Sequence, residues 1–375
     1  MKIIICTRDL VAGAGQYTKG LLKEFDRNDE IKKILVIGPQ KLKGYSEKIQ
    51  FDILRLRGDF FITKELIFAM ECQKRIKKAL RKEKYDIIYT CHPFLISKKF
   101  NFPFIAIFHG LHKLYLHTPI NTWKIKIAKI FHFLYSYFDY KTIQNADKIV
   151  FVSNRTLKEA EKFYPMYKNK FIHIPAFVDT LKFYQLNQTT KEKLIEKYKL
   201  EKDKKHVLYV GRLEPLKGIE LLIEIIKESR ESIKLELLVV GDGLLKKRRN
   251  FYTFVKYLGE IPHSRMNEIY NIVDLLILPS YYENCPLTIL EAMASSCPVL
   301  ASDVGDIGEI LNNNKLIFEV GNIEELQRKM FKLLNLDENE KNEIISALVQ
   351  KVNNNYNIEI ISKKILDLYK NVAKK

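Results

Sequence analysis

The sequence has little cysteine and no cysteine motif. Its cysteines are scattered along the chain at positions 6, 72, 91, 285 and 297, and none belongs to a Cys-x-x-Cys pair. An odd, dispersed set argues against a disulfide framework and against a zinc ribbon. We therefore expect a protein of the reducing cytoplasm.

Long apolar runs are also missing. The longest stretch without a charged residue, Phe100 to His112, has 13 residues, whereas a membrane-spanning helix needs about 20 apolar residues. The first residues, MKIIICTRDL, become charged too early for a signal peptide and instead predict a buried strand. We therefore expect no membrane-spanning segment.

The size and composition suit two globular domains. The chain has 375 residues, of which 47% are hydrophobic and 29% charged, which excludes a disordered or fibrous protein. The net charge is +18, and residues 1–180 hold nearly all of the excess, with 33 Lys and Arg against 17 Asp and Glu. Such asymmetry indicates an anionic partner for the first half of the chain.

Two segments of the first half combine cations with apolar side chains. Residues 64–84 predict a helix with Met70 and Ile76 on one apolar face, and residues 123–138 mix lysines with aromatic side chains. Basic helices with aromatic neighbours bind anionic membrane surfaces. Alternatively, the first segment presents a solvated helix face and the second packs against a sheet. For each segment alone, this alternative explains the pattern at least as well.

Short β-rich apolar runs alternate with amphipathic runs, which predicts an α/β chain of two Rossmann-like halves with parallel sheets. The expected strands are Lys2–Cys6, Ile34–Gly38, Asp86–Thr90, Phe104–Phe108, Lys148–Val152, Phe171–Pro175, His206–Val210, Leu235–Val240, Phe254–Leu258, Leu275–Leu278, Pro298–Ala301 and Leu316–Phe318. We expect domains at residues 1–180 and 181–355 and a final helical segment at 356–375.

In open α/β sheets ligands bind beyond the carboxyl ends of the strands. The first such loop carries Gly13 and Gly15 before a helix, where a backbone can approach a ligand and free N–H groups can donate to an anion. The pattern is neither GxGxxG nor a P-loop, so it does not support an NAD or ATP site. A plain tight turn explains it equally well.

A second loop follows the expected strand at 206–210 and carries Gly211, Arg212 and Lys217 before an amphipathic helix. An arginine can bind phosphate oxygens bidentately, and a lysine adds a point charge. Cations are unfavourable at a helix start unless an anion is bound there. We therefore favour a diphosphate site over two ordinary surface cations.

The strongest pattern runs from Glu283 to Glu291. Pro286 suits the first position of a helix, which leaves the N–H groups of Leu287 and Thr288 free for a phosphate. Glu291 lies about one turn farther along that helix and Glu283 lies on the loop before it, so the two carboxylates flank an anion site. This suits the hydroxyls of a ribose and of a sugar on either side of a diphosphate. Alternatively, Glu291 is an exposed helix residue and Glu283 a loop charge.

This run resembles the E-x7-E motif of family 4 retaining glycosyltransferases. Seven residues separate the two glutamates and Ala292-Met293-Ala294 follows, while Gly211-Arg212-Leu213 with Lys217-Gly218 resembles the diphosphate-binding loop of that family. The resemblance covers about residues 205–320. The first half is similar only loosely, through the glycines at 13 and 15, His109-Gly110 and Ser153.

The resemblance implies a GT-B fold, in which two Rossmann-like domains face a central cleft and the second holds most of a nucleotide-sugar donor. Arg212 and Lys217 would neutralise the departing diphosphate, assisted by the backbone near Leu287 and Thr288. The final helix would cross back to the first domain.

For the rest of the donor, the resemblance implies that Glu291 holds the ribose and that Glu283 binds the hydroxyls of the sugar. His109 would face the same sugar from the first domain. The family retains the anomeric configuration without an enzyme nucleophile, so the resemblance supplies none here.

The implied reaction moves a hexose-type sugar from a UDP- or GDP-sugar to a lipid-linked, phospholipid or surface-glycan acceptor. The basic first half would rest on the inner face of the cell membrane as part of a peripheral cytoplasmic enzyme, and no nucleic-acid partner is expected. The chain has no Asp-x-Asp sequence, so we expect a metal-independent enzyme without a cofactor. Cations can stabilise the departing diphosphate in place of a metal.

Three other interpretations stay open. A retaining glycosidase would use Glu283 and Glu291 as its carboxylate pair, but it leaves Arg212 and Lys217 unexplained. A nucleic-acid binder would explain the charge of +18, although the chain has no recognisable nucleic-acid motif. A related GT-B enzyme, such as a nucleotide-sugar epimerase, would share the donor site.

Two clusters carry weaker signals. His109, His112 and His117 lie close in sequence but have no cysteine or carboxylate near them in the chain, so we expect no zinc site there. The cations at residues 246–249 predict a solvated helix face, with an anionic ligand as the alternative.

Overall fold

The computed structural model describes residues 1–8, 10, 13–54, 61–91, 102–116, 123–230, 232–243 and 252–374, with the side chains of 61–66 and 123–128 excepted. The chain forms two compact units. Unit 1 contains Met1–Ala176 and Ile358–Lys375, and unit 2 contains Phe177–Asn357.

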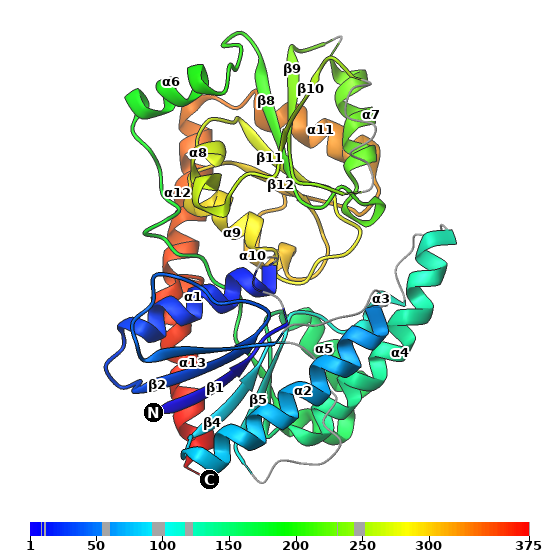
Figure 1. Cartoon of the computed structure of the whole chain (residues 1–375). Helices are drawn as coiled ribbons and strands as arrows, with labels where there is room; N and C mark the ends of the chain where they lie inside the picture. The colour runs from blue at the N-terminus through cyan, green and yellow to red at the C-terminus, as the bar shows by residue number, and fades with distance from the viewer. Residues whose placement is uncertain are drawn as a thin grey trace. The chain divides into compact units, whose positions relative to one another are not determined.

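Unit 1 is built on a parallel sheet of seven strands in the order β3-β2-β1-β4-β5-β6-β7 (Figure 1). Every residue of β4 and β5 is buried, as in strands that are covered on both faces. The strands are β1 Lys2–Cys6, β2 Lys33–Gly38, β3 Ile49–Ile53, β4 Ile87–Thr90, β5 Phe104–Phe108, β6 Lys148–Phe151 and β7 Phe171–His173.

The helices of unit 1 come from both ends of the chain. They are α1 Gly13–Arg27, α2 Phe61–Lys82, α3 His112–Tyr115, α4 Trp123–Asn145, α5 Asn154–Phe163, the 3-10 helix Pro165–Lys170 and the final helix α13 Ile358–Ala373. The α13 helix packs beside α1 and β4, where the fully buried ring of Tyr369 lies 6.0 Å from Phe25 and 5.8 Å from Tyr89. The last segment of the chain is therefore part of the core of unit 1.

Unit 2 has a parallel sheet of six strands in the order β10-β9-β8-β11-β12-β13 (Figure 1). The strands are β8 Lys205–Val210, β9 Leu235–Val240, β10 Val255–Gly259, β11 Leu275–Leu278, β12 Val299–Ser302 and β13 Ile317–Phe318. This is the strand order of a Rossmann sheet, in which the first and fourth strands are neighbours.

The helices of unit 2 connect these strands. They are α6 Gln188–Lys197, α7 Ile219–Ser229, α8 Met266–Tyr270, α9 Leu287–Ala294, α10 Ile307–Leu311, α11 Ile323–Leu334 and α12 Glu338–Asn355, with 3-10 turns at Pro215–Lys217 and His263–Arg265. The α9 helix packs against α12 and α8, and α11 packs against α7.

The expected α/β architecture of two parallel sheets is confirmed. Each strand expected from the sequence is present, with ends within two residues of the expected ones. β3 was not expected, because Gln50 and Asp52 interrupt its apolar pattern and only the edge of the sheet tolerates them. On α2 the predicted apolar face is wrong at Met70, which is exposed, whereas Ile76 is fully buried.

Gly218 generates a prediction about the turn that joins β8 to α7. Its φ of +68° is left-handed, and an added Cβ would lie 2.0 Å from Pro279 O, whereas Gly259 has a φ of +69° and open space around it. We expect Gly218→Ala to lower the free energy of unfolding by about 2 kcal/mol more than Gly259→Ala, since only the first adds a clash to the backbone strain. Denaturant unfolding measures both variants, and equal losses would contradict the close approach.

Candidate functional site

The two loops singled out in the second half of the sequence leave neighbouring strands of the unit 2 sheet. β8 and β11 pair directly, although β9 and β10 lie between them in the chain. The direction of winding reverses at this pair, and the loops at their carboxyl ends therefore flank the switch point of the sheet. This is where open α/β sheets bind ligands.

The loop after β8 has a fixed shape. Gly211 follows the strand directly, the N–H of Leu213 donates to Asp242 O at 2.9 Å, and the Tyr209 hydroxyl donates to Arg212 O at 2.8 Å. Burial raises the pKa of Tyr209 far above its usual value, so its hydroxyl stays protonated as a donor. The loop is thus preorganised by the protein itself.

Lys217 and Glu283 form an ion pair across the switch point. The distance from Lys217 Nζ to Glu283 Oε1 is 2.6 Å, and the two side chains are only 19% and 13% exposed. Ser280 Oγ also donates to Glu283 Oε1, at 2.9 Å. The family resemblance assigns Lys217 to the diphosphate and Glu283 to the sugar of one donor, and the structure places their side chains in contact.

Arg212 is placed differently from Lys217. Its side chain is 70% exposed and its Nη1 lies 3.0 Å from Glu214 Oε1. An exposed ion pair of this kind contributes little free energy. A ligand anion could therefore replace Glu214 as the partner of Arg212 at little cost in free energy.

The α9 helix presents its amino terminus next to this pair. The prediction that Pro286 is the first helical residue is wrong by one position, because Pro286 is extended, with a ψ of 120°, and the helix begins at Leu287. Within the described part of the chain, the N–H groups of Leu287 and Thr288 have no hydrogen-bond partner. Both residues are partly exposed, and the rest of α9 is buried.

Glu291 is buried within unit 2 and is not the exposed helix residue that the alternative interpretation assumed. It is 6% exposed. Its Oε1 lies 2.6 Å from His263 Nε2, and its Oε2 accepts a hydrogen bond from the Tyr270 hydroxyl at 2.9 Å. Burial and the charge of Glu291 raise the pKa of Tyr270 well above its usual value, which keeps this hydroxyl a donor.

His263 connects Glu291 to Lys182. Lys182 Nζ contacts His263 Nδ1, and because an ammonium group only donates, Nδ1 accepts and Nε2 carries the proton that points to Glu291. Lys182, His263 and Tyr270 were not expected from the sequence. They lie 109, 28 and 21 positions from Glu291 in the chain, and no local pattern connects residues so far apart.

Of the two glycines after β1, only Gly15 is required by packing in unit 1. A Cβ on Gly15 would lie 2.5 Å from the carbonyl carbon of Leu10, so only glycine lets α1 approach the preceding loop. Gly13 opens the helix, and a Cβ there would meet nothing within 4 Å. For Gly15, the interpretation as a tight turn accounts for the glycine without a ligand.

His109 lies just after β5, at the carboxyl end of the unit 1 sheet. Burial lowers the pKa of His109 to about 4, so the imidazole is neutral at physiological pH. Its ring packs edge-on against Tyr17 at 4.9 Å, and its Nε2 has no hydrogen-bond partner among the described residues.

In the histidine cluster at positions 109, 112 and 117, His112 contacts a carboxylate that is distant in the sequence. The fully buried Asp139 accepts from the backbone N–H of His112 at 2.8 Å and lies 2.9 Å from its Nδ1. His117 and residues 246–249 lie outside the described residues. In the part of the chain that the structure describes, no group of three or more His, Cys, Asp or Glu side chains is arranged to hold a metal ion.

Comparison with protein families matches both halves of the chain. Residues 11–182 match the model described as Glycosyltransferase Family 4, and residues 190–349 match the model described as Glycosyl transferases group 1. An uncharacterised glycosyltransferase of Methanocaldococcus jannaschii is 28% identical over 286 residues, which is 72% of each chain.

Solved structures share the fold over nearly the whole chain. Sucrose-phosphate synthase of Thermosynechococcus elongatus matches with a TM-score of 0.81 at 19% identity, covering 99% of each chain. HepE of Anabaena, solved in complex with UDP and glucose, matches with a TM-score of 0.75 at 16% identity, covering 99% of this chain and all of that one. At these identities the similarity establishes the GT-B fold.

The buried contact between Tyr270 and Glu291 makes a prediction about stability. Tyr270→Phe removes one hydrogen-bond donor from a buried carboxylate, and we expect a loss of about 2 kcal/mol in the free energy of unfolding. Tyr184→Phe is the control, since the Tyr184 side chain is half exposed and its change should stay within about 0.5 kcal/mol. Denaturant unfolding compares them, and equal effects would argue against the bond.

Proposed function

Since the chain belongs to the family 4, group 1 glycosyltransferases, we propose that it moves a hexose-type sugar from a nucleoside-diphosphate sugar, a UDP- or GDP-sugar, to a lipid-linked or surface-glycan acceptor. The anomeric configuration of the sugar is retained, and no metal ion takes part. The observation that carries this proposal is the Lys217–Glu283 ion pair at the switch point, beside the free amino terminus of α9.

A diphosphate suits this end of the unit 2 sheet because its charge is matched by three kinds of donor. Lys217 supplies an ammonium group, Arg212 supplies an exposed guanidinium, and the N–H groups of Leu287 and Thr288 lie at the positive end of α9. Negative charge grows on the diphosphate as it departs, so preorganised positive groups stabilise the transition state. The same groups make a metal ion dispensable, in keeping with a sequence that lacks Asp-x-Asp.

The ion pair also gives Glu283 a role after the donor binds. When the diphosphate takes Lys217 as its partner, the Glu283 carboxylate still holds the hydrogen bond from Ser280. It then has free lone pairs for hydroxyl groups of the donor sugar. Glu283 thus exchanges one partner for another as the donor enters.

Glu291 is assigned to the ribose. Tyr270 and His263 each occupy one lone pair of its two carboxylate oxygens, and the remaining lone pairs can accept bonds from the ribose hydroxyls. Its two protein partners hold the carboxylate in one orientation, which reduces the entropic cost of binding.

The α4 helix supports a peripheral contact of unit 1 with an anionic membrane. Large apolar side chains on this helix are between 39% and 65% exposed, which are Ile130, Phe131, Phe133, Leu134 and Tyr137. Lys141 Nζ lies 5.6 Å from the ring centre of Tyr137, so positive charge borders this apolar surface. No described helix is both long and apolar enough to cross a bilayer.

The donor proposal predicts different effects on nucleoside-diphosphate affinity when the two residues of the ion pair are replaced. Lys217→Met removes a charged donor to the diphosphate, so we expect its affinity for the preferred nucleoside diphosphate to fall about tenfold or more. Glu283→Gln frees Lys217, and its affinity should be unchanged or higher. Isothermal titration with UDP, GDP and ADP, with and without EDTA, measures both variants against the original protein.

In that titration one nucleoside diphosphate should bind the original protein equally well with and without EDTA. Equal losses in Lys217→Met and Glu283→Gln would contradict the assigned roles. Binding that EDTA abolishes would contradict metal independence, and binding of none of the three would contradict the donor site.

The membrane proposal predicts that the protein sediments with vesicles that contain phosphatidylglycerol and that high salt releases it. Replacing Ile130 and Phe133 by serine should weaken this binding at least about tenfold, because two exposed apolar side chains no longer enter the interface. Met166→Ser is the control, since Met166 is 87% exposed but lies outside α4. Equal binding of all three proteins would exclude α4 as the contact.

A further inference from the structure

A second pocket in unit 2 lies at the amino ends of β8 and β11, opposite to the diphosphate site. Its volume is about 390 Å³, within the usual range for small-molecule sites. Its lining includes Lys191 of α6, Lys341 of α12, the carboxylates Asp203 and Asp274, and Lys205 and His206 at the start of β8.

Two lysines that line this pocket come from the starts of two helices. Lys191 is the fourth residue of α6 and Lys341 is the fourth residue of α12, and both are partly buried. Among the described residues, neither side chain forms a hydrogen bond or an ion pair. Burial and then repulsion from Lys341 lower the pKa of Lys191.

The position of Lys191 within α6 adds a third unfavourable effect. The amino end of a helix carries a partial positive charge, which repels a cation in the first turn. The first turn of α6 contains no acidic residue that would offset it. Lys191 is thus opposed by burial, by a like charge and by the helix, and a bound anion would relieve all three.

The carboxylates that line the pocket are already engaged by other groups. Asp203 pairs with Lys234 at 2.7 Å. Asp274 accepts the backbone N–H of His206 at 2.7 Å and lies 3.5 Å from Lys205. The carboxylates of the pocket therefore do not pair with Lys191 or Lys341.

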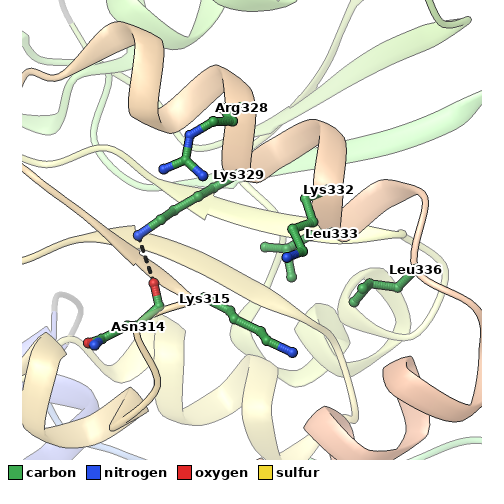
Figure 2. A pocket seen from close by; sticks show the side chains of 7 residues that line it. All are labelled: Asn314, Lys315, Arg328, Lys329, Lys332, Leu333 and Leu336. Carbon is green, nitrogen blue, oxygen red and sulfur yellow. Dashed lines mark hydrogen bonds between the residues drawn. The ribbon is translucent and has the colours of Figure 1, made fainter.

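The cations in another basic hollow of unit 2 are not destabilised by burial and repulsion in this way. Figure 2 shows Lys315 opposite Arg328, Lys329 and Lys332 of α11. Lys329 donates to Asn314 O at 2.7 Å and pairs with Glu325 at 2.8 Å. Arg328 and Lys332 are exposed to solvent, and Lys332 lies in the last turn of α11, where cations are favourable. These cations are satisfied by the protein and the solvent, so the hollow needs no ligand.

We propose that the pocket between the starts of α6 and α12 binds a phosphate group, either inorganic phosphate or the phosphate of a small phosphomonoester. A doubly charged group can bridge two ammonium groups that repel each other, and each keeps a full charge-assisted bond. β8 runs from this pocket to the diphosphate site, and its six residues span about 20 Å. The phosphate is therefore bound apart from the donor.

The test uses the full chain and thermal unfolding. Inorganic phosphate, glucose 6-phosphate and glucose are added separately, with sodium chloride at matched ionic strength as the reference. We expect at least one of the two phosphate compounds to raise Tm by about 5 °C at saturation, and glucose to leave it unchanged. A shift with glucose 6-phosphate alone assigns the pocket to phosphomonoesters.

Lys191→Met distinguishes a binding lysine from a structural one. Without phosphate its Tm should equal or exceed that of the original protein, because the repulsion is gone and the apolar stem is kept. With phosphate the shift should disappear. Lys332→Ala, from the hollow of Figure 2, should keep the full shift, and Arg212→Ala with Lys217→Ala should keep it as well.

Three results would overturn the proposal. One is the absence of a shift with either phosphate compound. Another is an equal shift in Lys191→Met, which would indicate a general salt effect or binding at the donor site. The third is a clear fall in the Tm of Lys191→Met without phosphate, which would make Lys191 a structural residue.

Discussion

The pairing of β8 with β11 is the constraint on which the proposed donor site depends. These strands are neighbours in the sheet although two other strands, β9 and β10, lie between them in the chain. Their pairing places Lys217 within 2.6 Å of Glu283, which lies 66 positions away. Two close backbone approaches, at Gly218 and at Gly305, where an added Cβ would lie 2.4 Å from Asn284 O, hold these loops in place. The charged groups are therefore oriented before a donor arrives, which is what electrostatic catalysis requires.

The charged side chains at the two ends of this sheet differ in whether they have protein partners. At the carboxyl end, Lys217 is paired with the Glu283 carboxylate, and Glu291 accepts hydrogen bonds from His263 and Tyr270, so both have protein partners in the free protein. At the amino end, Lys191 and Lys341 line one pocket and repel each other, and neither side chain has such a partner among the described residues. Balanced groups exchange one partner for another when a ligand binds, whereas unbalanced cations gain a partner that they lacked. This difference is the reason that the amino end points to an anion.

The charge asymmetry of the sequence fits the surface of unit 1. Apolar and aromatic side chains on α4 stay exposed, while Tyr135 and Phe138 of the same helix are buried. The helix therefore packs on its unit through one face and leaves another apolar face to solvent. An exposed apolar face on a basic unit has the composition of a membrane-binding surface. The packing interpretation thus describes one face of α4, and the membrane interpretation stays a proposal for the exposed face.

The α/β class, every strand except β3 and the loops of the candidate site followed from the sequence alone, because buried parallel strands produce continuous apolar runs and ligand loops follow them directly. The sequence also located Glu283, Glu291, Arg212 and Lys217 through local spacing. The three-dimensional fold was needed to show that Lys217 pairs with Glu283, that His263 and Tyr270 hold Glu291, and that Lys191 and Lys341 line one pocket. Local patterns record which face of an element is buried, whereas these contacts join residues that the winding of the sheet brings together from distant parts of the chain.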